Sequence, residues 1–126
     1  MCSSEVITDV KKVCIIDDDD AILEAIRIII EEEGYQAVSF NHAAAFIEYL
    51  KHNRPDVILL DIFLSGDDGR VICKELKANN GTHKIPVILM SASSQLEIDV
   101  IESHADSYIK KPFDINTLME EVGRQL

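Results

Sequence analysis

The sequence contains few cysteines and no long apolar run, and both features exclude whole classes of protein. Its three cysteines, Cys2, Cys14 and Cys73, are odd in number and widely spaced. This spacing argues against a disulfide framework or a zinc site and favours a reducing cytosol. No apolar stretch approaches the ~20 residues that span a bilayer, and the first residues lack the basic start and apolar core of a signal peptide. We therefore expect a cytoplasmic protein that does not associate with membranes.

Basic residues are also scarce. Lys and Arg number 12 against 23 Asp and Glu, for a net charge of −11, and no basic run exceeds two residues. Such a chain repels nucleic-acid phosphates, so direct nucleic-acid binding is not expected. By contrast, 47% of the 126 residues are hydrophobic, which suffices for the core of one domain and excludes disorder as the default state.

Short apolar runs rich in Val and Ile alternate with segments of helical period. Several of these runs are apolar throughout, as is typical of parallel strands buried on both faces. The pattern predicts an α/β fold of the flavodoxin-like type, a three-layer doubly wound (βα)₅ domain with a parallel five-stranded sheet of order 2-1-3-4-5. The expected strands are 13–16, 35–40, 57–60, 85–90 and 108–109.

Polar residues at the helix starts indicate where the expected helices begin. Asn41 and Asp114 are suited to cap the second and fifth helices. Residues 19–20 are acids in the first turn of the first helix, where the helix dipole favours negative charge. Ser94 and Glu97 have the spacing of a capping box and predict the start of the fourth helix there.

The polar residues that end the expected strands would meet at one edge of the sheet, where open α/β sheets bind their ligands. Carboxylates of Asp17, Asp18 and Asp61 that converge there suit a hard divalent cation such as Mg²⁺. With a lysine and a hydroxyl they would supply the charge neutralisation and positioning that phosphoryl transfer needs. The opposing interpretation, that single aspartates here are caps or turn formers, is the one we favour for Asp19 and Asp20. The strand-end residues are Asp17–Asp20, Asp61, Ser91 and Lys110-Lys111.

Four segments carry these residues in a specific order. They are Ile15-Ile16-Asp17-Asp18-Asp19, Asp56-Val57-Ile58-Leu59-Leu60-Asp61, Pro86-Val87-Ile88-Leu89-Met90-Ser91-Ala92 and Tyr108-Ile109-Lys110-Lys111-Pro112-Phe113. Together they resemble the receiver domain of bacterial two-component response regulators, in the CheY-like superfamily. The resemblance covers residues 11–126, which we interpret as the receiver domain, and leaves 1–10 as a lead-in segment.

The resemblance implies a role for each carboxylate. In this family the aspartate that ends the third strand, here Asp61, accepts a phosphoryl group from the phosphohistidine of a histidine kinase or phosphotransfer protein. The acidic pair after the first strand, here Asp17 and Asp18, binds Mg²⁺ together with Asp61 and the main-chain carbonyl of Phe63. Such a domain catalyses only its own phosphorylation and dephosphorylation, so it is not expected to be an enzyme towards an outside substrate.

The resemblance also implies how the phosphoryl group would be sensed. Ser91 would hydrogen-bond it and Lys111 would form a salt bridge to it, with the Lys111-Pro112 bond cis as in the family. Tyr108 stands in the place of the switch aromatic, which turns inward when the hydroxyl residue moves. Because the chain ends at the expected fifth helix, we expect a stand-alone regulator that acts on a downstream protein target by protein–protein contact.

Several positions depart from the family pattern. Ser65 replaces a usual proline and predicts a looser loop after Asp61, and His104 replaces a usual glycine before the fifth strand. The spacing of 20 residues from Ser91 to Lys111 is short and predicts that the fourth helix or its leading loop is shortened or irregular. Bulky Phe63 is either a barrier that slows water attack on the phosphoryl group or a loop aromatic without a kinetic role.

Three other functions are compatible with parts of this pattern. A phosphatase of the haloacid dehalogenase type would need a second acid where Phe63 stands. An FMN carrier would need a phosphate-binding loop where four aspartates follow the first strand. The third is a receiver-like docking module that acts without phosphorylation, which the sequence does not exclude.

Overall fold

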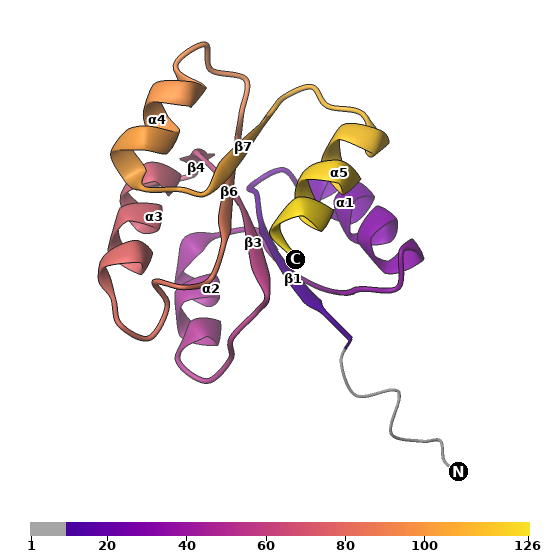
Figure 1. Cartoon of the computed structure of the whole chain (residues 1–126), viewed down its shortest axis with the longest axis horizontal. Coiled ribbons are helices and arrows are strands. Elements are labelled where there is room, and N and C mark those ends of the chain that lie inside the picture. The colour runs from indigo at the N-terminus through magenta and orange to yellow at the C-terminus, as the bar shows by residue number, and fades with distance from the viewer. Residues whose placement is uncertain (1–9) are drawn as a thin grey trace.

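The expected strands form one parallel sheet at the centre of the molecule (Figure 1). The computed structural model describes residues 10–126, so the expected lead-in lies outside the described residues except for Val10. The observed order β2-β1-β3-β6-β7 is the predicted 2-1-3-4-5 arrangement, because β6 and β7 are the fourth and fifth strands of this sheet. Its strands are β1 (Lys12–Ile16), β2 (Gln36–Phe40), β3 (Val57–Asp61), β6 (Val87–Ser91) and β7 (Ser107–Lys110).

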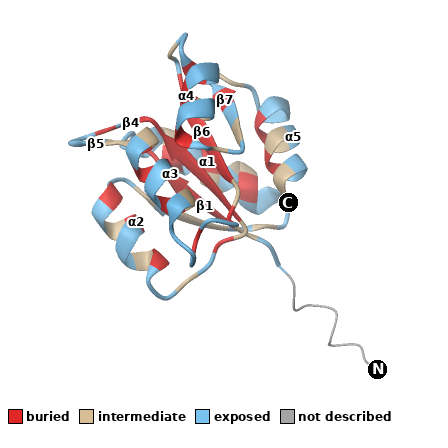
Figure 2. Ribbon diagram, turned by 60° about the vertical axis from the view of Figure 1, so that its left-hand side comes forward, coloured by how far each residue is buried: buried red, intermediate tan, exposed pale blue. Residues whose placement is uncertain are grey.

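Helices cover both faces of the sheet. In Figure 1, α1 and α5 lie on one side and α2, α3 and α4 on the other. Alternate residues of β1 divide between the two cores: Val13 and Ile15 pack in the α1/α5 layer, and Cys14 and Ile16 in the opposite layer. Burial is greatest along the sheet, as Figure 2 shows. The helices are α1 (Asp20–Glu32), α2 (Ala43–Leu50), α3 (Gly69–Ala78), α4 (Leu96–Ser103) and α5 (Ile115–Gln125).

The cap predictions have mixed outcomes. The Asp114 side chain accepts a hydrogen bond from the Thr117 N–H and caps α5 as predicted. The cap of α2 is His42 rather than Asn41, whose side chain instead donates to Asp20. The Asp19 carboxylate caps α1, and Asp20 lies in the first turn of that helix, so the cap interpretation of these two acids is confirmed.

Helix α4 begins without the predicted capping box. It has eight residues, starts after Gln95 and has no side-chain hydrogen bond at its N-cap. Of the helices within residues 10–126, α4 and α2 are the two shortest, and the shortening relative to the family stays a prediction. At its other end His104 adopts a left-handed backbone with φ of 64°, the conformation that the usual glycine would take most readily.

A short antiparallel hairpin, β4 (Phe63–Leu64) with β5 (Asp67–Asp68), follows β3 and was not predicted. Instead of a loose loop, the segment is a two-residue turn in which Gly66 has φ of +79°. Buried Leu64 anchors the hairpin to the core. Within residues 10–126, no helix is long and apolar enough to cross a bilayer.

Candidate functional site

The parallel sheet brings three aspartates to one point at its carboxyl edge. β1 pairs directly with β3, so Asp17, which follows β1, lies beside Asp61 at the end of β3. One carboxylate oxygen from each of Asp17, Asp18 and Asp61 lies within 4.8 Å of the others. Asp17 and Asp61 are buried, whereas Asp18 is exposed. The convergence predicted from the strand ends is therefore present.

Lys111 supplies the positive charge next to this cluster. Its Nζ lies 2.6 Å from Oδ2 of Asp17 and 3.5 Å from Oδ2 of Asp61. The Lys111 N–H donates to the Ser91 carbonyl at 2.9 Å, which continues the β6–β7 pairing beyond the strands. The Lys111-Pro112 peptide bond is cis, as the resemblance implied. Lys111 thus reaches the acidic cluster from the end of edge strand β7, and Asp17 is its nearer partner.

The buried position of Asp61 and its acidic neighbours raise the pKa of its carboxyl group. Burial, and next the neighbouring Asp17 carboxylate, raise the pKa of Asp61 to about 6, although Lys111 and the Phe63 backbone N–H act in the opposite direction. An ordinary aspartate has a pKa of about 3.9. One lysine therefore leaves the cluster short of positive charge, which is the condition that a bound cation relieves.

The three carboxylates fit a hard divalent ion. Mg²⁺ prefers oxygen ligands, takes one or two carboxylates directly and keeps several waters. The cluster offers this donor set at the carboxyl edge of the sheet, where Asp18 is exposed to solvent. Phe63 follows Asp61 by two residues and begins the hairpin strand β4. The part of its main-chain carbonyl in metal binding stays a prediction.

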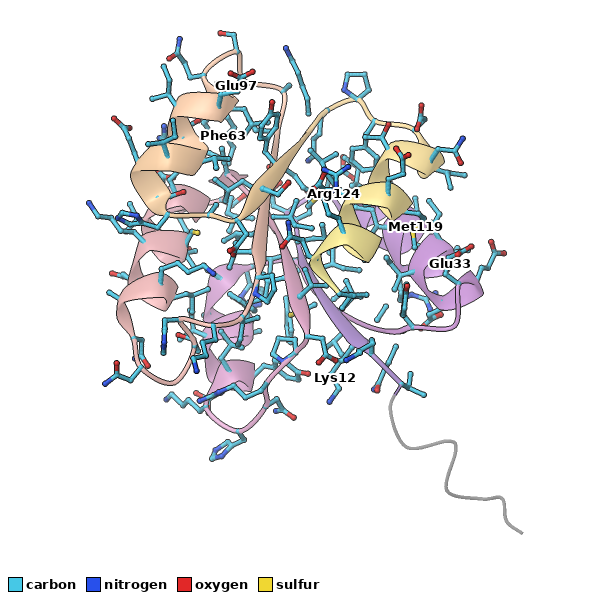
Figure 3. The ribbon with its side chains drawn as sticks, viewed as in Figure 1. Lys12, Glu33, Phe63, Glu97, Met119 and Arg124 are labelled. Atoms are coloured by element: carbon cyan, nitrogen blue, oxygen red, sulfur yellow. The ribbon has the colours of Figure 1, made fainter. Side chains whose placement is uncertain are left out.

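The hydroxyl and aromatic residues lie on β6 and β7, the two strands on one side of β3. Ser91 ends β6 and is buried, and its Oγ accepts a hydrogen bond from the Ser93 N–H at 3.0 Å. Tyr108 on β7 is 37% exposed, and its hydroxyl lies 3.3 Å from Oε1 of Glu97, which is labelled beside α4 in Figure 3. Tyr108 therefore lies at the surface, and its role as a switch aromatic stays a prediction.

The hairpin that follows Asp61 adds residues that were not predicted as part of the site. Gly69 closes the hairpin by donating to the Ile62 carbonyl at 2.8 Å, and a Cβ on Gly69 would collide with the Asp61 carbonyl. Ser65 at the turn places its Oγ 3.1 Å from Oδ2 of Asp18. The replacement of proline by serine was visible in the sequence, but not the partner of its hydroxyl 47 positions away.

The sequence also did not predict an ion-pair network between the hairpin, α3 and α4. Arg70 pairs with Asp68 of β5 at 2.7 Å and with buried Asp99 of α4 at 3.3 Å. The sequence does not indicate the pairing of Arg70 with Asp99, because these residues are 29 positions apart. The network connects the segment after Asp61 to α4.

Comparison with known proteins identifies the family. The family model described as response regulator receiver domain matches residues 13–123. The transcriptional regulatory protein CseB of Streptomyces avermitilis is 34% identical over 113 residues, which are 87% of this chain and 46% of that protein. The DNA-binding response regulator MtrA of Mycolicibacterium smegmatis is 29% identical, over 92% of this chain and 50% of its own. This chain spans about half the length of these relatives.

Solved structures agree in fold. The signal receiver domain of a signal transduction histidine kinase from Syntrophus aciditrophicus has a TM-score of 0.85 at 30% identity, and the match covers 92% of this chain and 89% of that one. Chemotaxis protein CheY4 of Vibrio cholerae has a TM-score of 0.86 at 20% identity, over 94% of this chain and all of its own (100%). The second likeness bears on the fold alone.

Proposed function

Because this chain belongs to the response regulator receiver domain family, we propose that it is a phosphorylation switch in which Asp61 accepts the phosphoryl group. Phosphorylation-based signalling is the function of this family, and its receiver domains are signalling modules. The observation that carries the choice of Asp61 is its place between Asp17, Asp18 and Lys111 at the carboxyl edge of the sheet. The proposed receiver domain comprises residues 11–126.

In the proposed reaction one Asp61 carboxylate oxygen attacks the phosphorus of a phosphohistidine. The new O–P bond forms as the N–P bond breaks, and the histidine nitrogen keeps the bonding electron pair and later takes a proton. The nucleophile must be ionised, and the raised pKa of Asp61, about 6, still leaves it mostly ionised at neutral pH. Phosphoryl transfer then depends on positioning and charge neutralisation.

Receiver domains generally bind Mg²⁺, and the proposed ligands here are Asp17, Asp18, Asp61 and the Phe63 carbonyl. When bound, Mg²⁺ neutralises charge on the transferred phosphoryl oxygens. Lys111 supplies the second positive charge and is already 3.5 Å from Asp61. Its ammonium is expected to exchange Asp17 for a phosphoryl oxygen once that group is in place.

Ser91 and Tyr108 are proposed to convert the new charge into a change of surface. A phosphoryl group adds about −1.5 to −2 charges and strong acceptor oxygens. Ser91 Oγ, which now accepts from Ser93, can turn its own proton towards those oxygens. Tyr108 is held outward through Glu97, so an inward move of Tyr108 would release this contact and change the α4–β7 surface.

We propose that the phosphoryl donor is a histidine kinase or phosphotransfer protein and that the output is a downstream protein target. The relatives CseB and MtrA carry names that describe transcriptional regulation and DNA binding, and they are about twice as long as this chain. For the residues of this chain we propose no direct nucleic-acid contact, because the net charge is −11. We also propose that it works in the cytoplasm, without membrane contact and without turning over an outside metabolite.

Intact-protein mass spectrometry tests the function. Wild type and Asp61→Asn are incubated with Mg²⁺ and a small acyl phosphate. We expect the wild type to gain the mass of one phosphoryl group and the variant to gain none. Equal gain by the two proteins would reject Asp61 as the acceptor. Failure of the wild type to gain mass would favour the alternative of a docking module that acts without phosphorylation.

A further inference from the structure

The three clustered carboxylates differ in how they are held. Asp17 accepts from the Asp19 N–H at 2.9 Å and from Lys111 at 2.6 Å, so each of its oxygens already accepts one hydrogen bond. Asp61 is buried and lies beside Lys111. Asp18 is exposed, and within residues 10–126 the Ser65 hydroxyl is its one side-chain hydrogen-bond partner. In the part of the chain that the structure describes, Ser65 is therefore the side chain that hydrogen-bonds the Asp18 carboxylate.

The backbone that carries Ser65 is fixed although its side chain is exposed. Leu64 next to it is buried and pairs across the hairpin with Asp67. Gly66 completes the turn with its positive φ. At the base of the hairpin the Gly69 N–H bonds to the Ile62 carbonyl. Ser65 is thus a rigidly placed donor at the open side of the acidic cluster.

We propose that Ser65 is a positioning residue that holds Asp18 in the conformation that binds the divalent cation. The proposal rests on the function proposed above, because it assumes that the cluster binds Mg²⁺. A hydroxyl that donates to Oδ2 leaves the remaining lone pairs of the carboxylate free for a cation. Without that donor, repulsion from the Asp17 and Asp61 carboxylates would favour conformations in which Asp18 points to solvent.

The expected effect follows from the general behaviour of groups that hydrogen-bond a metal ligand. Loss of such a partner usually weakens metal binding about 10–100-fold. Ser65 should therefore affect the affinity for Mg²⁺ and not the chemistry at Asp61. At saturating Mg²⁺ a variant without the hydroxyl should be phosphorylated as fast as the wild type.

Isothermal titration of the full chain with Mg²⁺ tests the proposal. We expect Ser65→Ala to raise the Kd about 10–100-fold and Ser65→Thr, which keeps a hydroxyl, to stay close to the wild type. Ser94→Ala is the matched control, because Ser94 is an exposed serine of the loop after β6. A Kd of Ser65→Ala within a factor of about two of the wild type would overturn the proposal, as would an equal loss in Ser65→Thr.

Phosphorylation by an acyl phosphate at rising Mg²⁺ separates this proposal from the function on which it rests. Ser65→Ala should need more Mg²⁺ but reach the wild-type rate, whereas Asp61→Asn should gain no phosphoryl group at any concentration. A Ser65→Ala rate that stays low at saturating Mg²⁺ would overturn the positioning role and leave the acceptor role intact. A wild type that shows no Mg²⁺ binding would reject both.

Discussion

Arg70 on α3 places its Nη1 3.3 Å from Oδ1 of Asp99 on α4. Asp99, the acidic partner of this ion pair, is buried. Arg70 is itself oriented by Asp68, whose carboxylate accepts from the guanidinium at 2.7 Å. Helix α4 is short and lacks a side-chain cap. Its placement against α3 therefore depends on contacts such as this one, because an isolated helix of this length is not stable in water.

Replacing Arg70 with glutamine should destabilise the protein, because Asp99 would keep a buried charge without a partner. Breaking a buried pair costs about 3–5 kcal/mol, but Arg70 is partly exposed, so we expect about 1–2 kcal/mol in urea unfolding. Arg27→Gln is the control, since Arg27 pairs with exposed Glu24 and Glu31 on α1 and should cost less than about 1 kcal/mol.

A second substitution distinguishes charge from packing in the Arg70 prediction. Asp99→Asn removes the buried charge, so adding it to Arg70→Gln should recover part of the lost free energy of unfolding. If the double variant is less stable than Arg70→Gln alone, the ion pair is not the reason for the loss.

Gly69→Ala should be strongly destabilising, because the new Cβ would overlap the Asp61 carbonyl and the Ile62 backbone. Overpacking of this kind costs about 1–3 kcal/mol or more. Gly123→Ala is the matched control on α5, where nothing lies within 4 Å of the added Cβ. There alanine should stabilise the helix by about 0.5–1 kcal/mol. Two variants with the same unfolding free energy would contradict the close approach at Gly69.

Lys111→Met should destabilise the protein more without Mg²⁺ than with it. The lysine is the cation nearest to buried Asp17, so its loss leaves uncompensated negative charge that a bound divalent ion would neutralise. Mg²⁺ at 100 times its Kd stabilises by about 2.7 kcal/mol through mass action, and this gain should be larger for Lys111→Met because the competing ammonium is gone.

Urea unfolding with and without Mg²⁺ measures the effect at Lys111. Lys77→Met is the control, because the Lys77–Asp106 pair, at 2.6 Å, lies at the end of β6 opposite to the acidic cluster. Its cost should be the same in both buffers. A Lys111→Met cost that does not change with Mg²⁺ would show that lysine and metal do not share the cluster.

Phe63→Ala should speed the loss of phosphate from Asp61 severalfold if the phenyl ring limits access of water. Phe63, which is labelled in Figure 3, is 60% exposed. It follows Asp61 by two residues in the sequence. The decay of the phosphorylated mass after removal of the acyl phosphate measures this rate. An unchanged half-life would leave Phe63 as a loop aromatic without a kinetic role.

The sequence determined the sheet and the composition of its edge. Continuous apolar runs such as 57–60 indicate burial on both faces and predict a parallel sheet. The flavodoxin-like strand order then predicts that Asp17 and Asp61 stand at neighbouring strand ends. Asp114 was also predictable as a cap, since a cap bonds to the backbone a few residues away. Both signals are local or periodic, which makes them readable from one sequence.

Tertiary structure decided the contacts between distant side chains. The sequence placed Lys111 at the acidic edge, but only packing set Asp17 at 2.6 Å and Asp61 at 3.5 Å from its Nζ. The bonds from Ser65 to Asp18 and from Arg70 to Asp99 likewise join segments 47 and 29 residues apart. Such contacts carry no period or local spacing, because they arise where folded elements meet, and they fix how the carboxylates and α4 are held.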